Sequence, residues 1–283
     1  MSLQKIRNNH PLAYAAAACA LAVACFTVVP AEGLDPLVAS LVQTALAALC
    51  MLCVLAAFDP SSLRWKMRRG TQSRTALFAC GVLALVALAA GVAAALLSAL
   101  GGREGGSLSF FVSPMASPGG VALFLLLCLV TGVFEEALFR GIVFKGFATA
   151  LENEERPRPV LVAAVVQAMV FGLLHVTTST SLESAIFTVA AVQTLVKPVQ
   201  AALFGFVMAG LLARTGNLWL LVGTHAAFNA LSEALLFALT GALPATYATG
   251  QPADLAVLLA TTVLLVPFAI HAASCLKKPD GCL

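Results

Sequence analysis

Apolar runs of about the length needed to cross a bilayer fill most of the 283-residue chain. A helix spans the hydrocarbon core with about 20 mainly apolar residues, and these runs lack the alternation that marks a strand of a membrane β-barrel. Because 60% of the residues are hydrophobic and only 10% are charged, the chain has too little polar surface to enclose a soluble globule. The sequence therefore predicts an all-α polytopic membrane protein.

The runs predict about eight transmembrane helices. We expect them at residues 12–29, 37–58, 76–100, 119–147, 160–175, 199–213, 218–241 and 254–274. The first is interpreted as a retained span, because Val29-Pro30-Ala31 is a poor signal-peptide cleavage site. Residues 177–197 are polar and then only briefly apolar, and the Lys197-Pro198 pair is expected to break them, so a re-entrant or interfacial segment is predicted there.

The distribution of basic residues indicates the membrane topology. Five of them lie between the second and third runs: Arg64, Lys66, Arg68, Arg69 and Arg74. By the positive-inside rule this loop is cytoplasmic, and so is the N-terminus. Eight spans also return Lys277 and Lys278 of the C-terminal tail to the cytoplasm. We expect an integral membrane protein in the plasma membrane of a prokaryote.

Other features of the composition exclude several functions. The net charge of +3 is too small to indicate nucleic acid as a partner, which leaves the lipid bilayer and membrane-associated substrates. Most of the eight cysteines lie within apolar runs and predict no disulfide framework. Cys50 and Cys53 form a CxxC with no second pair or histidine nearby, so core packing is favoured over a metal or redox site.

The fourth run carries charges inside its apolar stretch, in the sequence TGVFEEALFRG. Each charge costs a few kcal/mol in a span (about 2.5–3.5 on insertion scales), so Glu135, Glu136 and Arg140 are expected to face the bundle interior and to have a task. Glu136 and Arg140 are four residues apart and share a helix face, where they can form an ion pair. Glu135 then lies about 100° round the helix and is available as a general base. The alternative is a structural ion-pair network that locks the helices together.

Two further runs contribute matching polar groups. His175 ends the fifth run, four residues after Phe171, whose ring can hold the imidazole. His225 and Asn229 are also four residues apart in the seventh run and present an imidazole and a carboxamide to one side, which suits two donors to an oxyanion. These groups lie at similar depths in the predicted bundle, so we expect them to meet Glu135 in one site.

Three motifs in this order resemble the CPBP family, the CAAX-protease and bacteriocin-processing (Abi) intramembrane proteases related to type II CAAX prenyl endopeptidases. They are EExxxR (Glu135–Arg140), FxxxH (Phe171–His175) and HxxxN (His225–Asn229). The stretch GFVMAGLLARTGNLWLLVGTHAAFN is also similar to the glycine-rich helix, turn and histidine helix of that family. The resemblance covers residues 120–235, and residues 177–197 are longer than expected between two of its elements.

The resemblance implies an intramembrane endopeptidase that hydrolyses a peptide bond of a membrane-associated peptide, either a prenylated CAAX-like or a leader peptide. Glu135 and His175 would activate a water molecule, and His225 and Asn229 would stabilise the oxyanion. Residues 119–241 would form the catalytic core. Residues 1–118 would be a scaffold of three spans without a motif, and residues 242–283 the last span with a basic cytoplasmic tail.

By the same resemblance, Glu136 and Arg140 would hold the fourth helix in register, and the family is commonly classed as metalloproteases. Two histidines and a carboxylate would suit Zn²⁺, with Glu135, His175 and His225 as the ligands. HExxH is absent, and a glutamate with a histidine can activate water without a metal. The residues leave both chemistries open.

Two other functions fit the polar residues less well. A non-catalytic membrane scaffold or immunity-type protein could bind peptides or partner helices through the polar cluster, but binding does not require all of Glu135, His175, His225 and Asn229. A secondary transporter would also contain intramembrane carboxylates, yet it usually shows inverted repeats, and the sequence has no self-similar halves.

Overall fold

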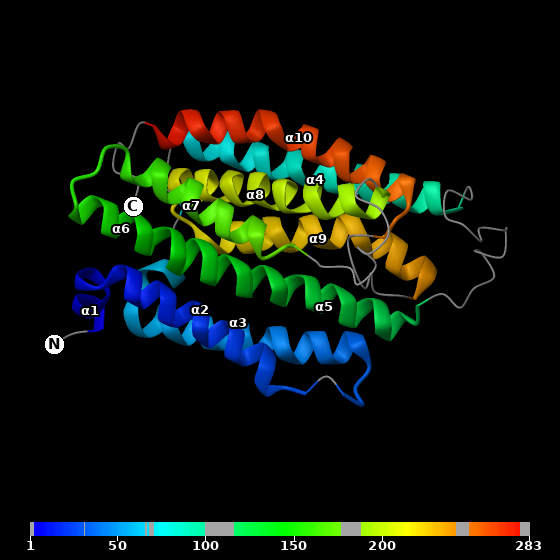
Figure 1. Ribbon diagram of the computed structural model, residues 1–283, viewed down its shortest axis with the longest axis horizontal. Coiled ribbons are helices and arrows are strands. Elements are labelled where there is room, and N and C mark those ends of the chain that lie inside the picture. Colours follow the sequence, from blue (N-terminus) through cyan, green and yellow to red (C-terminus); the bar gives the residue numbers. More distant parts are fainter. Residues whose placement is uncertain are drawn as a thin grey trace.

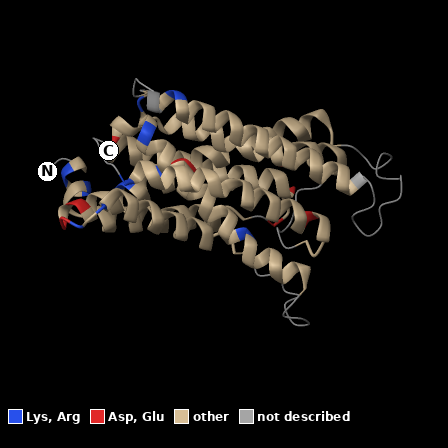
Figure 2. Ribbon diagram, turned by 90° about the horizontal axis from the view of Figure 1, so that it is seen from above, with Lys and Arg blue, Asp and Glu red and all other residues tan. Residues whose placement is uncertain are grey.

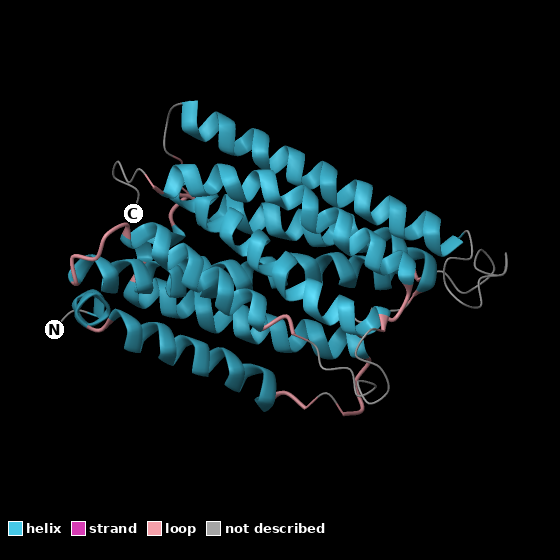
Figure 3. Cartoon of the chain, turned by 45° about the horizontal axis from the view of Figure 1, so that its top comes forward, coloured by secondary structure: helices cyan, strands magenta, loops and turns pink. Residues whose placement is uncertain are grey.

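The computed structural model describes residues 3–30, 32–65, 67, 71–99, 116–176, 188–241 and 249–277. Helices and loops alone make up this part of the chain, with no strand in it (Figure 3). The elements are α1 (Leu3–Asn9), α2 (Pro11–Val28), α3 (Pro36–Phe58), the 3₁₀ turn η1 (Pro60–Leu63), α4 (Thr71–Ala99), α5 (Pro118–Glu135), the π-helical segment η3 (Glu136–Phe144), α6 (Lys145–Asn153), α7 (Pro159–Leu173), α8 (Val189–Thr215), α9 (Leu218–Thr240) and α10 (Pro252–Leu276).

Within these described ranges, seven helices are long and apolar enough to cross a membrane, with α5, η3 and α6 counted as one continuous helix of 36 residues. They run along the length of one bundle, and α1 lies at the same end as the Leu276 end of α10 (Figure 1). Figure 2 shows most of the described Lys and Arg residues at that end. The prediction of an all-α polytopic membrane protein is confirmed.

The predicted span at 160–175 is wrong in its length. Helix α7 has 15 residues and ends at Leu173, which at 1.5 Å per residue gives about 22 Å, less than the hydrocarbon core. The backbone then tightens into a turn, in which the His175 N–H donates to the Gly172 carbonyl over 2.9 Å. This early ending lets His175 leave the helix inside the bundle.

The predicted break at Lys197-Pro198 is also wrong. Helix α8 continues through Pro198 from Val189 to Thr215. Proline removes one backbone hydrogen bond, but neighbouring helices compensate for this loss in membrane bundles. At this crossing, a Cβ on Gly172 of α7 would lie 2.5 Å from the Pro198 carbonyl oxygen, so glycine is what lets the two backbones meet. Residues 177–187 of the predicted re-entrant segment, and 101–115 of the preceding Gly/Ser/Pro-rich loop, lie outside the described residues.

A polar cluster around Asp59 closes one end of the bundle. Asp59 follows α3 and forms ion pairs with Arg7 of α1 at 2.8 Å and with Lys145 of α6 at 3.2 Å. It also accepts hydrogen bonds from the hydroxyls of Ser61 and Ser62. Burial alone would raise the pKa of Asp59, but Lys145, the two hydroxyls and Arg7 together lower it to about 2. This cluster joins three separate parts of the chain.

Candidate active site

The centre of the site is a buried row of charges in the π-helical segment. Glu136 and Arg140 are fully buried, and Arg140 Nη1 lies 2.9 Å from Glu136 Oε1, as their spacing predicts. The same Glu136 oxygen lies 2.7 Å from Nδ1 of His225 on α9. Rare π-helical segments often occur at functional sites. Here the segment begins at Glu136, so the two adjacent glutamates mark the point where the helix geometry changes.

Glu135 faces the other nitrogen of the same imidazole. Its Oε2 lies 3.4 Å from His225 Nε2, and its side chain is 17% exposed, whereas that of Glu136 is fully buried. Close packing of the two helices allows this contact, because a Cβ on Gly132 of α5 would lie 2.9 Å from the Val222 carbonyl oxygen of α9. The spacing along one helix does not reveal the contact, since His225 belongs to another.

The hydrogen bonds constrain the protonation of His225. Glu136 Oε1 accepts a hydrogen bond from Nδ1, so Nδ1 carries a proton unless Glu136 is itself protonated. The other ring nitrogen, Nε2, faces Glu135. The ring can donate towards both carboxylates only as an imidazolium. A buried carboxylate behind a histidine fixes the ring and its tautomer, as the aspartate does in Ser-His-Asp triads.

His175 is oriented by the carbonyl that ends α7. Its Nδ1 donates to the Phe171 carbonyl oxygen over 2.7 Å, which leaves Nε2 as an acceptor in the neutral ring. The Phe171 ring packs against the imidazole with centroids 4.6 Å apart, and the Arg140 guanidinium also lies 4.6 Å from the Phe171 ring centroid. Phe171 therefore connects the buried ion pair to the second histidine.

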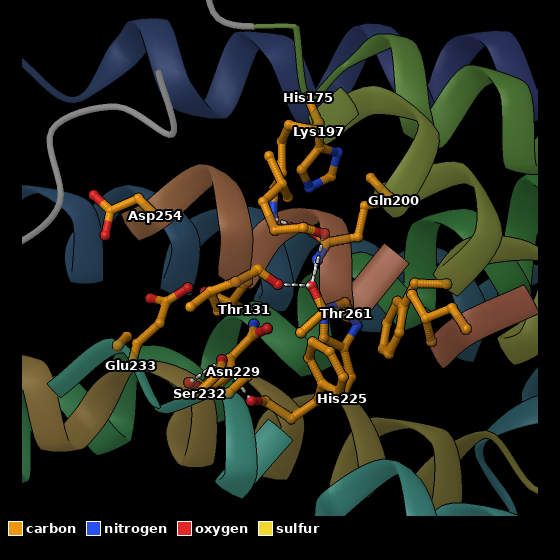
Figure 4. Close-up of a pocket in the computed structure, with 18 of the residues that line it drawn as sticks. Thr131, His175, Lys197, Gln200, His225, Asn229, Ser232, Glu233, Asp254 and Thr261 are labelled. Carbon is orange, nitrogen blue, oxygen red and sulfur yellow. Dashed lines mark hydrogen bonds between the residues drawn. The ribbon is translucent and has the colours of Figure 1, made fainter. Parts of the chain in front are cut away.

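A cavity of about 240 Å³ brings the predicted residues together. Glu135, His175, His225 and Asn229 line it, from three different helical segments. Glu136 and Arg140 do not line it but lie behind His225. Figure 4 shows Asn229 one turn along α9 from His225.

Several cavity residues received no role from the sequence. Among them are Thr131, Lys197, Gln200, Ser232, Glu233, Asp254 and Thr261. Glu233 continues the spacing of four that relates His225 to Asn229, and this repeat was the available signal. Lys197 is a charged residue in an apolar helix, and such a residue is by itself a candidate functional residue. Because Pro198 follows it, the sequence predicts a helix break at this pair.

The donor set fits a zinc ion only in part. Two ligands of a tetrahedral zinc with bonds of about 2.0–2.2 Å lie about 3.4 Å apart, which matches the separation of Glu135 Oε2 and His225 Nε2. The buried Glu136 behind His225 resembles the carboxylates that orient zinc-bound histidines. Among the described residues, however, no three His, Cys, Asp or Glu side chains come together as a metal site.

The fold and the cavity define the class: a helical membrane protein with paired carboxylates and two histidines converging inside its bundle. Residues 117–231 match the family model described as type II CAAX prenyl endopeptidase Rce1-like. The match begins one residue before α5 and ends within α9, so it includes all three motifs. It confirms the resemblance to the CAAX-protease (CPBP) family. No curated protein and no solved structure matches the chain.

Proposed function

We propose that this protein is an intramembrane endopeptidase that hydrolyses a peptide bond of a membrane-associated peptide or lipidated protein. The observation that carries the proposal is the convergence of Glu135, His175 and His225 on one cavity, within a segment that matches a CAAX endopeptidase family. In the proposed reaction Glu135 takes a proton from a water molecule, and the water oxygen attacks the peptide carbonyl carbon.

His175 supports this step as an acceptor. In the neutral ring with Nδ1 donating to the Phe171 carbonyl, Nε2 is unprotonated, so it can accept a hydrogen bond from the attacking water and orient it. When the C–N bond breaks, Glu135 returns the proton to the departing nitrogen. The products are a carboxylic acid and an amine, and the side chains end in their starting states.

His225 and Asn229 are assigned to the oxyanion. Nδ1 of His225 already faces Glu136, so donation from Nε2 to an oxyanion requires a proton on both ring nitrogens. The Asn229 carboxamide, one turn further along α9, provides the second donor. Removing a single oxyanion donor typically lowers kcat by about 10²–10³. Glu136 and Arg140 are positioning residues that hold His225 in place.

The test is cleavage of a quenched fluorescent farnesylated CAAX peptide by the purified protein in detergent. We expect wild type to cleave the peptide, and Glu135→Ala and His225→Ala to lose activity while remaining folded by thermal unfolding. Each protein is also assayed with a chelator and after added zinc, because zinc rescue would assign a metal to the site. If wild type cleaves neither this peptide nor a panel of membrane peptides, the proposal is wrong and the cluster is a binding site.

A further inference from the structure

The described lysines and arginines gather at one end of the bundle. Apart from Arg140 and Lys197, they lie at the end that holds α1, the Asp59 cluster and the last turn of α10 (Figure 2). We call this the basic end, and by the positive-inside rule we expect it on the cytoplasmic side of the membrane. Its described members are Lys5, Arg7, Arg64, Arg74, Lys145, Arg156, Arg158, Arg214 and Lys277.

The cavity lies in the opposite half of the bundle. Helix α7 begins at Pro159, near the basic end, and stops at Leu173 after about 22 Å, so it fills only part of the depth of the bundle. The lining residues of α9 run from His225 to Leu236, away from the start of this helix at the basic end. No described lining residue comes from the basic end itself.

The lining becomes more exposed with distance from the basic end. His225 is 4% exposed, Glu233 further along α9 is partly exposed, and Thr249, just before α10, is exposed. Asp254 in the first turn of α10 also lines the cavity, and Figure 4 shows it with Glu233 on the side away from His225. The cavity therefore opens at the end opposite the basic end.

A packed apolar layer closes the other side of the site. Ile142, Phe144 and Leu221 lie between the paired charges and the basic end, and all three are 0% exposed. Leu55 of α3 is also 0% exposed and packs against Gly141, where a Cβ would lie 3.0 Å from the leucine side chain. Protein interiors packed in this way contain few voids that hold a water molecule. This layer separates the site from the basic end.

Hydrolysis consumes one water molecule for each peptide bond, so the site needs a path to water. Asn229, Ser232 and Glu233 line the part of the cavity between His225 and its open end. The Ser232 hydroxyl donates to the Phe228 carbonyl over 2.8 Å, which leaves its oxygen to accept from water. A polar space of about 240 Å³ is large enough for several water molecules. Water therefore reaches the catalytic residues from the open end.

We propose that substrates reach the active site from the non-cytoplasmic side of the membrane. This proposal rests on the function proposed above and names its substrate class: membrane-anchored peptides whose scissile bond lies in or beyond the non-cytoplasmic leaflet. Such substrates are exported before they are cleaved. A lipidated protein held at the cytoplasmic surface presents its peptide to the closed basic end.

Side-specific labelling of single cysteines tests the direction in which the cavity opens. In a background whose eight native cysteines are replaced by alanine or serine, Ser232→Cys and Thr249→Cys report on the cavity. Arg156→Cys, in the loop between α6 and α7, is the matched control at the basic end. A small, permanently charged thiosulfonate reagent is added to right-side-out and to inside-out membrane vesicles.

The reagent stays on the side to which it is added, because its charge does not cross the hydrocarbon core. We expect the two cavity cysteines to react about tenfold faster or more in right-side-out vesicles, and Arg156→Cys to react faster in inside-out vesicles by a similar factor. Modification is measured as a mass shift of the protein.

Peptide cleavage in the same vesicles tests the substrate class. A peptide that wild type cleaves in detergent is extended by charged residues, so that it too stays on the side of addition. We expect cleavage about tenfold faster or more in right-side-out than in inside-out vesicles, and equal rates once detergent opens both. Equal cleavage by wild type and the cysteine-free protein in detergent shows that the labelling background is intact.

The outcomes separate the two proposals. If no peptide is cleaved in detergent, the proposed function fails and the substrate class fails with it. If the peptide is cleaved in detergent but at least as fast in inside-out as in right-side-out vesicles, only the direction of access is wrong. Reaction of Ser232→Cys and Thr249→Cys from the same side as Arg156→Cys would also overturn it. Reaction of Arg156→Cys from the outside, with the cavity cysteines reacting from the inside, would show a cavity that faces the cytoplasm.

Discussion

In the described part of the chain, two clusters pair a buried carboxylate with an arginine, one around Asp59 and one around Glu136, and they differ in what surrounds them. Around Asp59, the partners Arg7 and Lys145 are 25% and 27% exposed, and two serine hydroxyls donate to the carboxylate. Around Glu136, the Arg140 partner is fully buried, and the cluster extends through His225 to Glu135 at a cavity wall. The first arrangement joins separate parts of the chain, whereas the second places a carboxylate and an imidazole at the wall of a cavity.

The two clusters should differ most in the unfolding free energy that is lost when the arginine of each is replaced by methionine. Arg140→Met leaves Glu136 buried without its cation, so we expect a loss of about 3–5 kcal/mol in unfolding free energy together with loss of peptidase activity. Arg7→Met is the matched control at the partly exposed cluster and should cost about 0–1 kcal/mol. Denaturant unfolding in detergent measures both. Equal losses of unfolding free energy in the two variants would show that the buried arginine contributes no more to stability than the partly exposed one.

Gly172→Ala should disturb the cavity cluster, because it forces the backbones of α7 and α8 apart. Its Cβ would lie 2.5 Å from the Pro198 carbonyl oxygen, so α7 must move from α8, at an expected cost of about 1–3 kcal/mol. Since His175 is three residues further on, kcat should fall as well. Gly223→Ala in α9 is the control, because a Cβ there meets nothing within 4 Å. Thermal unfolding and peptide cleavage are measured on both, and a Gly172→Ala protein as active as the control contradicts the close contact.

The Asp59 cluster should reveal itself by its response to acid. The folded pKa of Asp59 is lowered to about 2, below the value of about 3.9 in an unfolded chain. The stability that Asp59 contributes, on the order of 1–2 kcal/mol, is therefore fully present above about pH 4 and is lost as the pH falls towards 2.

Asp59→Asn should remove this part of the pH dependence, which thermal unfolding of wild type and variant between pH 2 and 6 would detect. Parallel curves for the two proteins would mean that Asp59 does not have a lowered pKa.

The sequence predicts interactions within one helix well and interactions between helices poorly. The ion pair of Glu136 with Arg140 and the contact of Phe171 with His175 follow from a spacing of four residues. The contact of Glu135 with His225 depends on how closely α5 approaches α9, which the motifs do not specify.

Local propensity was also misleading at Lys197-Pro198. Proline predicts a helix break from its own chemistry, but packing against Gly172 and α10 keeps α8 continuous, and so places Lys197 in the cavity. The spacing of residues does not predict the π-helical segment either. Within it, a Cβ on Gly141 would lie 3.0 Å from the Leu55 side chain, a contact that depends on how closely α3 packs.

Whether the cavity cluster is the active site can be tested by mass spectrometry of a membrane peptide incubated with wild type, Glu135→Gln and Asp59→Asn. The proposed function predicts the same cleavage with wild type and with Asp59→Asn. Folded Glu135→Gln should be slower by about 10²–10⁴, the usual contribution of a general base. Cleavage by Glu135→Gln at the wild-type rate would contradict the assignment of the cavity cluster as the active site.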